Sequence, residues 1–157
     1  RKNRWKYLYM RLLDNTTREC LYPAYMGDEH QELEITRQYA ETHPELYEQI
    51  LEKNVNSDKE EQMIKVGLEA LEKIKGHTEV RSKIALLTAK YACDIDKPEI
   101  YEYCWIAAFQ SDKSILNYMR VRFLVQDWSK YEELVLQNCR FVPKTEQTQH
   151  CMLLFWN

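Results

Sequence analysis

The stretch SDKEEQMIKVGLEALEKIKG, residues 57–76, combines a helix start, an apolar stripe and a helix stop. Ser57 followed by Glu60 is the pattern of a capping box, in which two side chains satisfy the first free amides of a helix. The apolar stripe that follows has helical spacing and is made of Met63, Gly67, Ala70, Leu71 and Ile74. Lys73 and Lys75 lie where a helix C-terminus favours cations, and Gly76 is a typical stop.

The same start signal recurs along the chain about every 17 residues. The candidate N-cap residues are Asp28, Thr42, Ser57, Thr78, Asp96, Asp112, Asp127 and Thr145. Two such intervals make a hairpin of roughly 34 residues, the size of the units that stack into helical-repeat arrays. We therefore predict an all-α fold of about nine or ten helices, arranged as antiparallel hairpins in a right-handed α-α superhelix.

The middle of this array is predicted to consist of helices over 58–75, 78–94, 97–111 and 113–126. The segment 97–111 has little polar surface, so its helix needs neighbours on more than one side. The segment 113–126 carries its apolar residues at helical spacing, namely Ile115, Tyr118, Met119 and Phe123. This pattern predicts inner members of a stack rather than an isolated hairpin.

The composition agrees with helices and with a single domain over residues 1–157. Apolar residues make up 45% of the chain, whereas glycine (3) and proline (4) are too scarce for a β-sandwich of this length. The chain begins at Arg1 without Met and ends within the apolar run 152–156. We expect it to be a fragment of a longer protein.

Charge is distributed unevenly, although the formal net charge is only −3. Residues 1–20 carry six basic and two acidic groups, and residues 28–61 carry eleven acidic and three basic groups. Such asymmetry either orients a partner or keeps a helix face solvated. The overall charge does not indicate a general polyanion binder.

The five cysteines, Cys20, Cys93, Cys104, Cys139 and Cys151, are an odd number with wide spacing and contain no CxxC pair. This usage is typical of reduced, buried thiols in a cytoplasmic protein. The sequence contains no signal-peptide pattern, and no apolar run approaches the length of a bilayer span, so no membrane association is expected.

Catalytic and metal-binding motifs are missing from the sequence, which has no GxGxxG, GxxxxGK[ST], HExxH or GxSxG. His30 and Glu34 share a helix face, but acidic residues in a first turn are explained by the helix dipole. We therefore expect no enzyme activity, cofactor or metal. An unrecognised helical active site is the alternative, and it requires convergent His and carboxylate groups, drawn from His30, His43, His77 and His150.

The first segment, RKNRWKYLYMRLL, is both basic and aromatic. Trp5, Leu8, Tyr9 and Leu12 recur at helical spacing, which predicts an amphipathic helix docked on its neighbour. The cations of this helix also suggest a second interpretation, in which they neutralise phosphates while aromatic rings stack on bases. The candidate nucleic-acid contacts are Lys2, Arg4, Lys6 and Arg11.

Two resemblances add to this interpretation. The hairpin 80–113 resembles a tetratricopeptide-like repeat, with Ala89 and Ala108 at its small positions but Tyr101 at another position that is usually small. In the equivalent frame one repeat later, Phe123 stands where that family has Gly or Ala. The run AAFQSDKSILNY, residues 107–118, is similar to helical arrays that accompany SWIM-type zinc fingers in bacterial proteins. The zinc finger itself, CxC followed by CxH, is absent, so this resemblance implies only the array and no metal.

The favoured function is a non-enzymatic scaffold in a bacterial cytoplasm that binds a protein or peptide, because stacked helical hairpins present extended faces to partners. The alternative is a nucleic-acid-associated accessory module that uses the basic first helix. The sequence does not identify the partner.

Overall fold

The computed structural model describes residues 28–76 and 78–140, and these residues form helices and no strand. The elements are α3 (Glu29–Gln38), α4 (Glu45–Lys53), α5 (Glu60–Lys73), α6 (Thr78–Asp94), α7 (Pro98–Ser111), α8 (Ile115–Leu124), the 3-10 turn η1 (Trp128–Lys130) and α9 (Glu132–Arg140). The all-α class is therefore confirmed. The described part contains seven α-helices, fewer than the nine or ten expected, and the helices expected before Asp28 and from Thr145 lie outside it.

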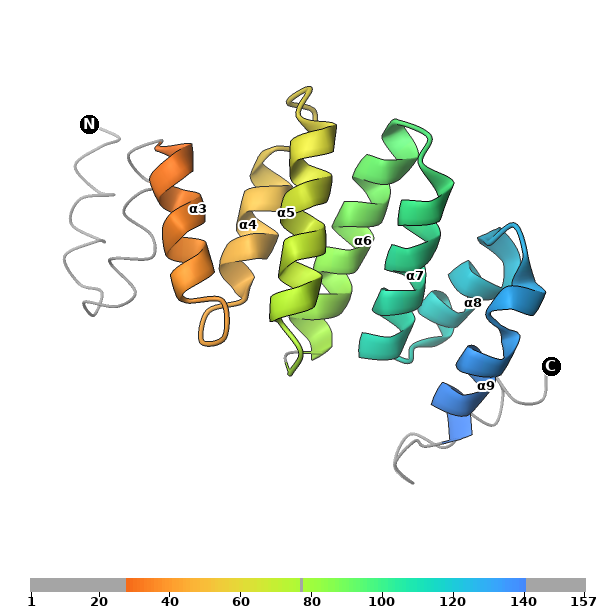
Figure 1. Ribbon diagram of the computed structural model, residues 1–157. Helices are drawn as coiled ribbons and strands as arrows, with labels where there is room; N and C mark the ends of the chain where they lie inside the picture. The colour runs from red at the N-terminus through yellow and green to blue at the C-terminus, as the bar shows by residue number, and fades with distance from the viewer. Residues whose placement is uncertain (1–27, 77, 141–157) are drawn as a thin grey trace.

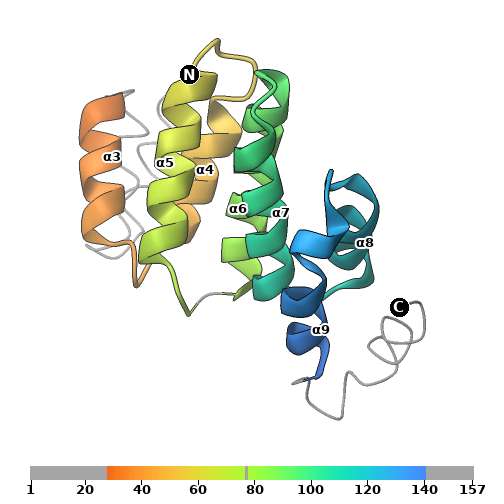
Figure 2. The ribbon, with the colours of Figure 1, turned by 45° about the vertical axis from the view of Figure 1, so that its right-hand side comes forward.

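Successive helices pack side by side as an array (Figure 1). Helix α6 lies against α5 and α7, and α4 contacts α6 as well as α5. Figure 2 shows that α5 and α7 form one layer while α4 and α6 form the layer behind it. Each inner helix therefore has neighbours on more than one side, as its apolar pattern predicts.

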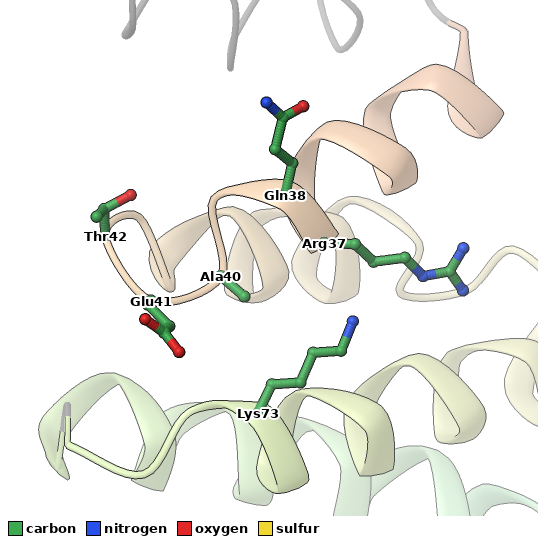
Figure 3. A pocket seen from close by; sticks show the side chains of 6 residues that line it. All are labelled: Arg37, Gln38, Ala40, Glu41, Thr42 and Lys73. Carbon is green, nitrogen blue, oxygen red and sulfur yellow. The ribbon is translucent and has the colours of Figure 1, made fainter.

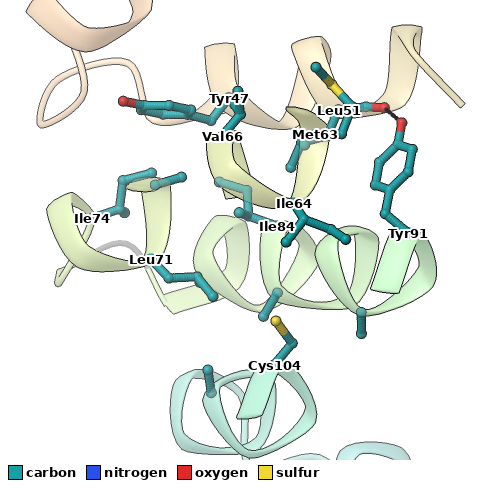
Figure 4. Packing of buried hydrophobic residues seen from close by; sticks show 14 of the residues in the cluster. Tyr47, Leu51, Met63, Ile64, Val66, Leu71, Ile74, Ile84, Tyr91 and Cys104 are labelled. Atoms are coloured by element: carbon teal, nitrogen blue, oxygen red, sulfur yellow. Dashed lines mark hydrogen bonds between the residues drawn. The ribbon is translucent and has the colours of Figure 1, made fainter. Parts of the chain in front are cut away.

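The main hydrophobic core lies between α4, α5, α6 and α7 (Figure 4). Its largest fully buried side chains include Tyr47, Leu51, Ile74 and Ile84. The hydroxyl of Tyr91 donates to the carbonyl of Leu51 at 2.5 Å, and so satisfies a free carbonyl near the end of α4. A second, smaller buried cluster joins α7, α8, η1 and α9 and contains Ile106, Phe109, Tyr118, Val121, Val125 and Val135.

Helices α5 and α6 approach closely at Gly67 and Thr88, which are both buried. A Cβ atom built on Gly67 would lie 1.9 Å from Oγ1 of Thr88. That hydroxyl is fixed because it donates to the carbonyl of Ile84 at 2.8 Å. The glycine of the 57–76 stretch is therefore a packing requirement of this helix pair.

The predicted helix starts are only partly correct. Asp28 is the N-cap of α3, and its Oδ1 accepts from the amide of Gln31 at 3.0 Å. The capping prediction is wrong for Thr42 and Ser57, because α4 begins at Glu45 and α5 begins at Glu60 without a side-chain cap. The two hydroxyls instead donate to carbonyls of the preceding turns, Ser57 to Asn54 at 2.6 Å.

The connections before α7 and α8 also differ from the prediction. Asp96 has a φ of 52° and forms part of a turn, and α7 then begins with Pro98 in its first turn. Helix α8 is capped by Ser114 rather than Asp112. The backbone carbonyl of Asp112 accepts from Nδ2 of the buried Asn117 at 2.8 Å, so this aspartate belongs to the α7–α8 turn.

Candidate interaction surface

Four of the five exposed large apolar side chains of the described residues lie on helix α8. Its N-cap is Ser114, whose Oγ accepts from the amide of Asn117 at 3.3 Å. Tyr118 and Val121 point into the second cluster, where the Tyr118 ring lies 6.3 Å from that of Phe109 and 6.4 Å from that of Trp128. These contacts determine which face of α8 is buried.

Two buried polar groups hold the ends of α8 in place. At its start, Nδ2 of Asn117 donates to the Asp112 carbonyl across the α7–α8 turn. Beyond its end, the Glu102 carboxylate on α7 accepts from the amide of Gln126 at 2.7 Å and from the Tyr131 hydroxyl at 3.2 Å. Because both groups are satisfied from neighbouring elements, α8 and η1 have a defined position on α7.

The face of α8 opposite the buried one is also apolar. Leu116, Met119 and Phe123 are 66%, 46% and 58% exposed, and we call these three residues the α8 apolar stripe. Leu124 on the same helix and Tyr103 on α7 are the other exposed large apolar side chains of the described residues. The stripe therefore has the spacing of a helix face that packs against a partner.

The structure corrects the apolar pattern predicted for 113–126. Tyr118 is buried as expected, but Met119 and Phe123 face solvent, and Val121 takes the buried position. The signal that the prediction missed is that apolar residues occur on all sides of this segment, so periodicity alone allows more than one buried face.

Two arginines border the stripe. Nη1 of Arg120 donates to Oδ1 of Asn117 at 2.6 Å. The guanidinium carbon of Arg122 lies 4.8 Å from the centre of the Trp128 ring and 5.7 Å from that of Phe123, in cation–π geometry. Every ion pair that the structure shows among its described residues joins side chains between 29 and 97, so neither arginine is paired with a carboxylate there.

A shallow pocket of about 390 Å³ lies near the other end of the array, between the C-terminal ends of α3 and α5 (Figure 3). It is lined by Arg37, Gln38, Ala40, Glu41, Thr42 and Lys73. The two cations in this lining both bind Glu69, Arg37 Nε at 2.9 Å and Lys73 Nζ at 3.1 Å. Arg37 also pairs with Glu34 at 2.7 Å, so two carboxylates balance these two cations and the pocket lining offers no unpaired positive charge to an anion.

The described thiols have different environments. Cys104 is buried in the main core as predicted, and burial raises the pKa of its thiol to about 12, which makes it a poor nucleophile. Cys93 is exposed, so the prediction of burial is wrong at that position. The side chains of Cys20, Cys139 and Cys151 lie outside the described residues.

The structure does not bring the described histidines into a common site. His30 is exposed on α3, and Nδ1 of His43 lies 3.0 Å from Oε1 of Glu45. Within the described residues, no group of three or more His, Cys, Asp or Glu side chains is placed to hold a metal. His77 and His150 lie outside these residues, as do the predicted nucleic-acid contacts Lys2, Arg4, Lys6 and Arg11.

Comparison with protein-family models, with curated proteins and with solved structures finds no match to this chain. Among the described residues, no helix has both the length and the apolar character needed to cross a bilayer.

Proposed function

We propose that this chain is a non-enzymatic scaffold of the bacterial cytoplasm that binds a protein or peptide partner. In this proposal residues 1–157 form one tetratricopeptide-like domain, and its hairpins continue as an α-α superhelix. The side-by-side packing of α4 to α7 supports the proposal, because stacked helices present extended surfaces and bury their polar backbone within each helix.

The observation that carries the proposal is the concentration of exposed apolar side chains on α8. Isolated exposed apolar residues are common on proteins, but a contiguous group is typical of an interaction surface. Here Leu116, Met119 and Phe123 follow one helix face, and the ordered helix needs no rearrangement to present them. A partner that covers this face gains apolar contact at a low cost in conformational entropy.

Site-specific photo-crosslinking in the native organism tests this function. We expect a photoreactive amino acid at position 116 to form a discrete adduct with another polypeptide. The adduct should disappear with F123S and persist with the exchange K65E, which changes an exposed lysine on α5. The absence of discrete adducts from position 116, and from further exposed positions spread over α4 to α8, would contradict the scaffold proposal.

The alternative function, nucleic-acid binding by the basic first helix, stays a prediction because its residues lie outside the described part. The observation in its favour is the charge of residues 1–20, which carry six basic and two acidic groups. It predicts affinity for DNA or RNA that falls steeply with salt and is lost when Lys2, Arg4 and Lys6 are reversed in charge. No binding at low salt would eliminate this alternative.

A further inference from the structure

Helix α8 is apolar on two opposite faces, but the described residues cover only one of them. Asn117, Tyr118 and Val121 are buried, whereas Leu116 and Phe123 on the other side are more than half exposed. An unpaired apolar face of this kind matches the i, i+3, i+7 pattern by which one amphipathic helix recognises another. The question is which helix covers it.

The charge around the stripe indicates what the partner carries. Arg120 and Arg122 have no carboxylate partner among the described residues, because every ion pair shown there joins side chains between 29 and 97. These two arginines are the charged residues of α8 itself, which has no acidic residue. The stripe is thus apolar at its centre and positive at its rim.

A second copy of the chain does not complement this combination of features. A two-fold pairing of α8 with its own copy would bring the rim arginines against one another, and like charges at an interface are unfavourable. A head-to-tail pairing would offer the acidic segment 28–61. However, the exposed large apolar side chains of the described residues are confined to α7 and α8, so that acidic surface has no matching stripe.

We propose that α8 binds an amphipathic helix from a different protein, with an apolar stripe flanked by Glu or Asp residues. This inference rests on the proposed scaffold function and specifies the chemistry of its partner. Leu116, Met119 and Phe123 contact the apolar stripe of the bound helix. Arg120 and Arg122 pair with its flanking carboxylates, for which the planar guanidinium is well suited.

The indole of Trp128 contributes to the site by holding Arg122. The guanidinium lies over both Trp128 and Phe123, which keeps it at the edge of the stripe rather than free in solvent. Trp128 itself is held because η1 follows the loop that Glu102 binds through the Gln126 amide. The rim of the site is therefore pre-organised by contacts within the protein.

Three designed helical peptides with one shared leucine stripe test the proposal, with flanks of Glu, Gln or Lys. Their affinities for the full chain are measured by fluorescence anisotropy at low and moderate salt. We expect the Glu peptide to bind about tenfold or more tightly than the Lys peptide, since two charge pairs separate them. The difference in affinity between the Glu and Lys peptides should become smaller at higher salt, because salt screens the charge pairs.

Variants of the chain separate the two parts of the site. L116S/F123S should weaken every peptide at least about tenfold, since truncating central apolar anchors has the largest effect on binding. R120E/R122E should reverse the order, so that the Lys peptide binds best, and R120E alone should reduce the preference without disturbing the Trp128 contact. The matched charge exchange K65E/K90E, on exposed lysines of α5 and α6, should leave all three affinities unchanged.

Several outcomes would overturn the proposal. Equal affinities for the three peptides would eliminate the charge recognition, and tighter binding of single-stranded RNA at the same arginines would identify a polyanion surface instead. A dimer that F123S converts to a monomer would identify a second copy as the occupant. A gain in affinity on deletion of residues 145–157 would identify that segment as the occupant.

Failure of this inference can be distinguished from failure of the scaffold function. If none of the peptides binds α8 while photo-crosslinked adducts still form at other positions of the array, only the partner chemistry assigned to α8 is wrong. If both the peptides and the adducts are absent, the scaffold proposal fails as well.

Discussion

The carboxylate of Glu69 joins three helices through four hydrogen bonds. Arg37 of α3 donates to it through Nε at 2.9 Å and Nη2 at 3.0 Å, Tyr47 of α4 donates at 2.8 Å, and Lys73 donates from the next turn of α5 at 3.1 Å. These donors, Arg37 above all, lower the pKa of Glu69 from 4.5 to about 2. The ionised Glu69 carboxylate therefore connects α3, α4 and α5 at the start of the described array.

We expect Glu69→Gln to lower stability at pH 7 by about 1–3 kcal/mol, because the amide replaces a carboxylate that accepts charge-assisted hydrogen bonds. Folding lowers the pKa of Glu69, so its contribution to the free energy of unfolding is complete above the ordinary pKa of 4.5 and is lost as pH falls towards about 2. Thermal melts should therefore show a difference in melting temperature between wild type and variant that becomes smaller as pH falls from 4.5 towards about 2.

The exposed neighbour Glu72 provides a matched control for that experiment. It lies on the same helix and joins none of the ion pairs shown among the described residues, so Glu72→Gln should change the melting temperature little. If the difference in melting temperature between wild type and Glu69→Gln stayed constant from pH 7 to pH 2, that result would contradict the role assigned to the carboxylate.

At the scale of helices, the contact between α5 and α6 depends on the missing side chain of Gly67. In an exposed helix, Gly→Ala stabilises by about 1 kcal/mol, because alanine has the higher helix propensity. Here the added Cβ would meet Thr88 Oγ1 at 1.9 Å. We expect Gly67→Ala to destabilise the protein by roughly 1–3 kcal/mol, as overpacking does in cores. Urea denaturation measures the change.

The double variant Gly67→Ala/Thr88→Ala tests whether the clash is the cause. Removing the threonine hydroxyl and methyl relieves the contacts at 1.9 and 2.8 Å, although the Thr88 Cβ, 2.8 Å from the new Cβ, stays, so the loss in the double variant should be smaller than the sum of the two single losses without vanishing. Additive losses, or a single Gly67→Ala variant that is more stable than wild type, would show that the helices do not pack as closely as the structure indicates.

The order of helices in the described part was predictable because each helix has a periodic apolar face separated from the next by polar residues. The starts were less predictable. Thr42 and Ser57 hydroxyls can cap a following helix or bind a preceding carbonyl, and here they do the latter. Local sequence does not distinguish the two roles, because both need only a hydroxyl near a helix end.

The candidate surface was not predictable for a different reason. In α8, Met119 and Phe123 are four residues apart and Tyr118 and Val121 are three apart, and either spacing places a pair on one helix face, so periodicity does not determine which face is buried. The choice depends on partners in the neighbouring elements, namely Phe109 of α7 and Trp128 of η1, which contact Tyr118. A tertiary contact thus decides which apolar residues remain available for binding.

At the scale of the whole molecule, α7 links two buried clusters. Its Cys104 and Ala108 belong to the main core, and its Ile106 and Phe109 belong to the cluster with α8 and α9. In stacked helical arrays, stability is approximately the sum of local units and the interfaces between neighbours. The C-terminal cluster should therefore open without unfolding α4 to α6.

Hydrogen exchange on two cavity variants tests this order. Val121→Ala, in the C-terminal cluster, should cost roughly 1–3 kcal/mol and raise exchange only in α8 and α9. Ile84→Ala, in the middle of the main core, should cost about 2–5 kcal/mol and raise exchange from α4 through α8, because α8 packs on an α7 that has lost its support. Uniform exchange increases with Val121→Ala would instead identify one cooperative unit. In that case an α8 variant that loses binding must first be shown to stay folded, before the loss is assigned to the α8 apolar stripe.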